Sequence, residues 1–255
     1  MSSQEFNNQK RIIEEKNKCL IENFKILNQL FNKHKITYWL DWGTLLGAVR
    51  EKKIIDWDTD IDIGIIDNSY KKVLSIIPEI EKHGFYLRKS IIKEANFHIS
   101  RNGCYIDIWP YKTKNDKVVS VYAYSLDNKS LLIIWQINYC VKTKLKYIVH
   151  TKGSTKSKIL TYLICALVKI PSKIKIFKKF IINLTNNILK KNVTLLKLTV
   201  PKKFFENLKT INFYGIKTNI PADIEKYLIF KYGKNWRIPD KKWLWKKTLS
   251  KVKRI

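Results

Sequence analysis

The chain has 255 residues, a hydrophobic fraction of 45% and a formal net charge of +29. So apolar a composition excludes an intrinsically disordered chain, and the length suits one large domain or two small ones. The charge favours a polyanionic partner, such as a nucleic acid, an anionic membrane or a phosphorylated substrate, without choosing among them.

Apolar periodicity organises the first half of the chain. It predicts helices over residues 5–34 and 69–82, the latter with Asp67 or Asn68 as N-cap, and a short helix that opens at Gly43-Thr44. Strands are expected at 36–41, 60–66, 85–92, 96–101, 104–109 and 117–125.

The second half has a different character. Between residues 140 and 200, lysines alternate with isoleucine, leucine and phenylalanine at helical spacing, which predicts helices with basic faces. Residues 201–255 return to a compact pattern. It contains a helical FFENL, a short strand INFYG, a turn-rich KTNIP and a helix ADIEKYLIFKYG.

Cysteines and apolar runs bear on the cellular compartment. Four cysteines stand at positions 19, 104, 140 and 165 without a CxxC pair, so we expect reduced thiols and neither a zinc site nor a disulfide framework. The N-terminus lacks the apolar segment of a signal peptide. The longest apolar run, residues 160–168, is shorter than the roughly 20 residues that a membrane span needs. These features predict a cytoplasmic protein, with peripheral attachment to a membrane as an alternative.

Acidic residues, scarce elsewhere, alternate at Asp58, Asp60 and Asp62. In a strand, Asp60 and Asp62 share one face, Asp58 stands at the entry, and the intervening isoleucines point into the core. Carboxylates this close repel one another unless a cation lies between them, and Mg²⁺ or Mn²⁺ suits such oxygen ligands. A solvated acidic face is the alternative, and Asp58 could instead accept hydrogen bonds within its turn. An EF-hand is excluded, because its sixth position is not glycine and its twelfth is not glutamate.

Two further segments extend this candidate site. Gly43 and Thr44 follow a strand and open a helix, where backbone amides and a hydroxyl can seat a phosphate that Arg50 also reaches. Helix capping is the alternative for this pair. Asp107, within the β-like run CYIDIWPY, is expected to supply a third carboxylate, unless it pairs with a lysine.

These residues resemble a known family, the LicD and fukutin-related proteins of the nucleotidyltransferase-fold superfamily. The resemblance rests on GTLLGAVREKKIIDWDTDIDIGI, on YIDIWP and on FYGIKTNIPADIEKYLIFKYGKNWRIP at residues 213–239. Three positions depart from the usual pattern: Asp56 replaces a proline, Trp109 replaces a phenylalanine, and Thr59 stands where a further aspartate is frequent.

The resemblance implies an α+β fold, a nucleotidyltransferase-like mixed sheet flanked by helices with an added basic helical region. One domain would span residues 1–255. It would comprise an N-terminal helix at 1–35, the core at 36–125, the basic helices at 126–200 and a C-terminal element at 201–255 that packs on the core.

The implied activity is transfer of a phospho-alcohol, such as phosphocholine or ribitol phosphate, from a CDP-alcohol donor to a glycan acceptor, with release of CMP. Asp60, Asp62 and Asp107 would hold the metal and carry catalysis. The donor-binding residues would be Gly43, Thr44, Arg50 and Asp58.

Two rival functions stay open. The same fold could transfer a nucleoside monophosphate from an NTP to a small molecule, a protein or RNA. A basic module for nucleic acid is less favoured, because such a binder has no need of aligned aspartates. The basic helices either lie on an anionic membrane or bury their apolar residues in the core, namely Leu163, Leu167, Ile174 and Phe177.

Overall fold

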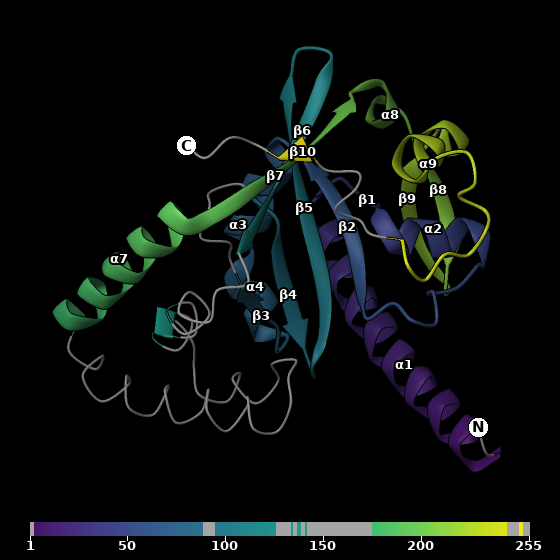
Figure 1. The fold of residues 1–255 in the computed structure, drawn as a ribbon, viewed down its shortest axis with the longest axis horizontal. Coiled ribbons are helices and arrows are strands. Elements are labelled where there is room, and N and C mark those ends of the chain that lie inside the picture. Colours follow the sequence, from purple (N-terminus) through teal and green to yellow (C-terminus); the bar gives the residue numbers. More distant parts are fainter. Residues whose placement is uncertain are drawn as a thin grey trace. The chain divides into compact units, whose positions relative to one another are not determined.

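The computed structural model describes residues 3–88, 95–125, 134, 137–138, 141, 175–243 and 250–251 (Figure 1). The chain divides into two compact units. The first comprises residues 1–90, 94–121 and 197–250, and the second comprises 91–93, 122–196 and 251–255.

Up to residue 192, helices and strands within the described ranges follow the predicted order. The helices are α1 (Ser3–Lys33), α2 (Trp42–Arg50), α3 (Asn68–Ser75), α4 (Ile77–Lys82), α7 (Lys175–Asn192), α8 (Lys203–Glu206) and α9 (Ile224–Tyr232). The strands are β1 (Tyr38–Leu40), β2 (Asp60–Ile66), β3 (Tyr86–Arg88), β4 (Phe97–Arg101), β5 (Cys104–Lys114), β6 (Lys117–Ser125), β7 (Val193–Pro201), β8 (Leu208–Phe213), β9 (Ile216–Pro221) and β10 (Ser250–Lys251). Within these ranges, no helix combines the length and apolar character that a membrane crossing requires.

A mixed sheet forms the framework of the first unit. Strand β2 runs antiparallel to β1 and parallel to β5, and β5 pairs on its other side with the β3–β4 hairpin (Figure 1). Five isoleucines are fully buried, namely Ile61, Ile63 and Ile65 of β2 and Ile106 and Ile108 of β5. The residues that alternate with them, which include the aspartates, therefore share the opposite face. The register places Asp62 directly beside Asp107. The predicted mixed sheet with flanking helices is confirmed.

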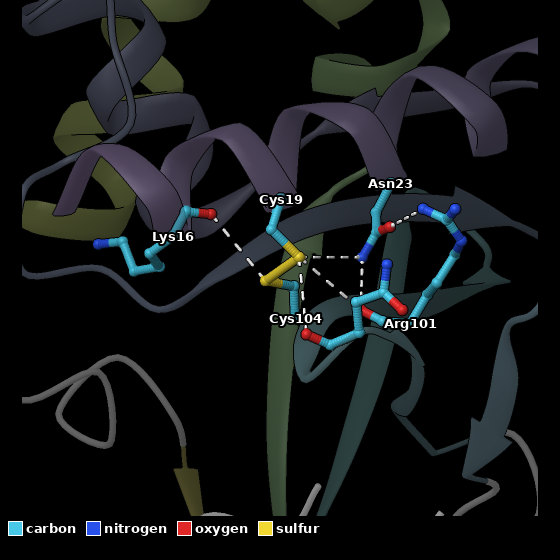
Figure 2. The surroundings of a disulfide bond; sticks show 6 residues. Lys16, Cys19, Asn23, Arg101 and Cys104 are labelled. Carbon is cyan, nitrogen blue, oxygen red and sulfur yellow. Dashed lines mark hydrogen bonds between the residues drawn. A yellow bond between two sulfur atoms is a disulfide. The ribbon is translucent and has the colours of Figure 1, made fainter. Parts of the chain in front are cut away.

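Helix α1 lies along β5 and is fixed there by a disulfide between Cys19 and Cys104 (Figure 2). The buried Asn23 side chain, one turn further along α1, donates to the Arg101 carbonyl and accepts from the Arg101 guanidinium. The expectation of reduced thiols is wrong for this pair. The two cysteines are 85 positions apart, and only the packing of α1 on the sheet brings them together. Positions 140 and 165 lie outside the described residues.

Local patterns misjudged three segments. The basic helices expected up to residue 200 end before it, because Val193–Pro201 forms the strand β7, which is rich in β-branched residues and buries every second residue from Leu196 to Val200.

The helix expected at 69–82 is two helices, because Pro78 in the first turn of α4 cannot continue the hydrogen bonds of α3. Asp67 stands at the N-cap position of α3, but its carboxylate accepts from Thr113 rather than from the helix. The turn-rich KTNIP forms β9, paired with β8 through a two-residue turn at Tyr214-Gly215, where both residues have positive φ.

Candidate functional site

Three aspartates at the start of β2 bring their carboxylates together. Asp58, Asp60 and Asp62 each offer one oxygen, and these oxygens all lie within 4.8 Å of one another. Asp60 and Asp62 reach this point through strand alternation, whereas Asp58 reaches it through the loop before β2. The Nζ of Lys16 on α1 holds that loop, donating to the carbonyl oxygens of Asp56 and Asp58.

The electrostatics of the group favour a bound cation. Burial raises the pKa of Asp62 well above its ordinary value, and the charges of Asp60, Asp58 and Asp107 raise it further. Burial also raises the pKa of Asp58. Such a group carries its full negative charge only at a cost, which a divalent cation would remove. The ligands are all carboxylate oxygens, and this donor set fits Mg²⁺ or Mn²⁺.

Asp107 lies beside this group on the neighbouring strand. Its Oδ1 is 2.5 Å from Nδ1 of His98, which occupies the paired position on β4. Among the described residues, the compact set of three candidate metal ligands contains Asp58 and not Asp107. Sequence reasoning assigned Asp58 to the donor and Asp107 to the metal, and both assignments stay predictions. The lysine partner considered for Asp107 is replaced here by a histidine.

The first residues of α2 contact the aspartates. The Thr44 hydroxyl accepts a hydrogen bond from the backbone N–H of Asp62 at 2.8 Å, and Thr44 is buried. A Cβ atom on Gly43 would collide with the carboxylate of Asp58, so only glycine leaves room for that carboxylate. The N-cap of the helix is Asp41, which accepts from the N–H of Trp42. Gly43 and Thr44 therefore contact the acidic group directly, and their phosphate contacts stay predictions.

Arg50 has protein partners. Its guanidinium binds the carboxylate of Glu51 at 2.5 Å and donates to the carbonyl of Trp236 at 3.3 Å. The side chain is largely buried by these contacts. It joins the end of α2 to the segment that follows α9, and its proposed contact with donor phosphates stays a prediction.

A buried ion pair, which sequence reasoning missed, lies next to the acidic group. Asp41 binds the Lys231 ammonium of α9, and both side chains are fully buried. The hydroxyls of Tyr111 and Tyr227 donate to the same carboxylate at 2.6 and 2.8 Å. The Lys231 ammonium also lies 3.7 Å from the centre of the Trp42 ring. This network ties the C-terminal element to the start of α2.

Two indole rings connect this ion pair to the acidic group. The Trp42 ring packs against the Trp109 ring, with their centroids 4.8 Å apart. The Nε1 of Trp109 donates a hydrogen bond to Oδ1 of Asp62 at 3.0 Å. The signals in the sequence were a lysine within the apolar run YLIFKYG and a tryptophan two residues after Asp107. Neither signal identified a partner, since Asp41 and Lys231 are 190 positions apart.

The sequence of this chain is similar to those of known proteins. Residues 35–133 match the family model described as LicD/FKTN/FKRP, nucleotidyltransferase domain. The protein RT0683 of Rickettsia typhi is 34% identical over 111 residues, which is 44% of this chain and 34% of that protein. Human ribitol 5-phosphate transferase FKRP is 32% identical over 89 residues, 31% of this chain and 18% of FKRP. The lipopolysaccharide cholinephosphotransferase LicD of Haemophilus influenzae is 40% identical over 47 residues, 18% of each chain. The chain thus spans about a third or less of the length of these relatives.

Proposed function

Because residues 35–133 carry the nucleotidyltransferase domain of the LicD/FKTN/FKRP family, we propose that this chain is a metal-dependent phosphotransferase. It moves a phospho-alcohol group from a CDP-alcohol to a glycan hydroxyl and releases CMP. The observation that carries the proposal is the convergence of Asp58, Asp60 and Asp62 beside Asp107. The names of FKRP and LicD, a ribitol-phosphate and a phosphocholine transferase, support the class of group transferred.

The carboxylates have separate roles in this scheme. Asp58, Asp60 and Asp62 would hold Mg²⁺ or Mn²⁺, so that Asp58 takes the ligand position that the sequence assigned to Asp107. The metal, when bound, would offset the negative charge of the donor pyrophosphate. Asp107 takes the proton from the acceptor hydroxyl, and His98 orients the Asp107 carboxylate. The hydroxyl oxygen forms a bond to the β-phosphorus, the bond from that phosphorus to the bridging oxygen breaks, and CMP leaves with the bridging oxygen.

The surroundings of the site contribute to donor binding. Gly43 leaves room for the Asp58 carboxylate, and Thr44 fixes the backbone of Asp62, so both residues set the positions of the ligands that face the donor phosphates. Arg50 is proposed to exchange part of its contact with Glu51 or Trp236 for a donor phosphate.

A donor screen tests the proposal. The purified chain with Mg²⁺ is offered CDP-choline, CDP-ribitol and the four NTPs, with and without candidate glycans, and CMP and pyrophosphate are measured. We expect CMP from one CDP-alcohol, and Asp60→Ala should abolish it. Asp56→Ala is the matched control. It removes a half-exposed carboxylate from the same loop, and within the described part of the chain this carboxylate pairs with Lys53. Pyrophosphate from an NTP would replace the proposal with nucleotidyl transfer.

A further inference from the structure

Helix α7 has two apolar faces, and only one of them is buried. Thr185 and Leu189 are buried, and Thr185 accepts a hydrogen bond from the Asn138 amide at 2.5 Å. On the other face, large apolar side chains are open to solvent. Their exposed fractions are 83% for Ile176, 40% for Phe177, 59% for Phe180 and 49% for Leu184.

The exposed residues form one continuous stripe. At 100° per residue, these four residues fall within a sector of about 100°, and Thr185 and Leu189 lie on the opposite side of the helix. The rings of Phe177 and Phe180 contact each other, with centroids 6.5 Å apart. A stripe of this width on an exposed helix costs free energy in water, so it indicates a partner.

Charge identifies the chemistry of that partner. Helix α7 contains no acidic residue, and Lys178, Lys179 and Lys191 are exposed on it. The surrounding sequence is equally one-sided, since residues 128–205 contain 17 lysines and no aspartate or glutamate. A nucleic acid would pair with the lysines and could stack its bases on the phenylalanines, but it would leave the aliphatic Ile176 and Leu184 in water. A lipid surface with anionic headgroups satisfies both.

We propose that α7 lies on an anionic membrane surface, with Ile176, Phe177, Phe180 and Leu184 inserted between the headgroups. The lysines then contact the lipid phosphates. The sequence left open whether Leu163, Leu167, Ile174 and Phe177 are buried in the core or contact a membrane. Phe177 is exposed in the structure. The other three lie outside the described residues. This proposal does not depend on the phosphotransfer reaction.

Vesicle flotation of the full chain tests the proposal. Vesicles of phosphatidylcholine alone are compared with vesicles that also contain phosphatidylglycerol, at low and at high salt. We expect flotation only with the anionic vesicles. The double variant Ile176→Ser/Phe180→Ser should reduce the partition coefficient at least about tenfold, because two large apolar side chains no longer insert. Lys179→Gln should reduce it about fivefold at low salt.

Helix α1 provides the matched control. Phe6 and Ile12 are 58% and 61% exposed, so Phe6→Ser/Ile12→Ser removes the same side chains from another exposed helix surface. This variant should float as the wild type does. The proposal is overturned if flotation is equal on both kinds of vesicle, if the α1 variant loses as much binding as the α7 variant, or if the chain does not float. Two further results would overturn it. One is a dimer in light scattering that the Ile176→Ser/Phe180→Ser variant does not form. The other is binding of an RNA oligonucleotide that is lost when Phe180 is replaced, together with no binding to lipid.

Discussion

The ion pair between Asp41 and Lys231 should be the most sensitive single contact that stabilises the fold around the site. Both side chains are fully buried, so solvent does not screen them. Burial lowers the pKa of Lys231, and the charge of Asp41 opposes that effect. Lys231→Met keeps the apolar stem and removes the cation, which leaves a buried carboxylate bound only by neutral donors. Removing one partner of such a pair costs about 3–5 kcal/mol, and we expect this loss in urea unfolding followed by tryptophan fluorescence.

Two controls separate charge from packing. Adding Asp41→Asn to Lys231→Met should restore at least half of the lost stability, because no charge is then buried. The amide oxygen still accepts from Trp42 and Tyr227, and the amide nitrogen can donate to the Tyr111 hydroxyl. Lys226→Met, on the same helix, breaks an exposed pair with Asp223 and should leave the urea midpoint nearly unchanged. A loss below about 1 kcal/mol for Lys231→Met, or no recovery in the double variant, would refute the reasoning.

Three other perturbations address the metal ligands and the disulfide. The raised pKa of Asp62 means that the metal-free fold binds this proton more tightly than the unfolded chain does, so its stability should fall as pH rises through the folded pKa. Melting temperatures measured across this pH range should fall less steeply for Asp62→Asn, and for the wild type in saturating Mg²⁺, than for the metal-free wild type. A fall as steep or steeper in either case would contradict the prediction. Gly43→Ala should displace the Asp58 carboxylate and weaken Mn²⁺ binding about tenfold or more, as measured by electron paramagnetic resonance. Unchanged binding would show that this carboxylate is not a metal ligand. Cys19→Ser should cost roughly 2–5 kcal/mol in urea unfolding, because the disulfide closes a long loop, and dithiothreitol should destabilise the wild type but not the variant.

The sequence alone located the acidic strand and its faces. Alternation of aspartate with isoleucine over residues 60–65 predicted β2, and the isoleucines are buried while the carboxylates gather on the other side. Alternation also predicted the strand that carries Asp107. The short helix expected to open at Gly43-Thr44 starts one residue earlier, at Trp42. Such patterns are readable because side-chain direction in a helix or strand follows from backbone geometry within a few residues.

Tertiary structure decided which distant residues meet. It set the register that brings Asp62 beside Asp107, the loop that brings Asp58 to the ligand group, and the pairings of Asp41 with Lys231 and of Cys19 with Cys104. These contacts join segments of the chain whose local patterns are independent of one another. Their partners are selected by packing and by the cost of leaving a charge buried and unpaired, and neither quantity exists until the whole domain has folded.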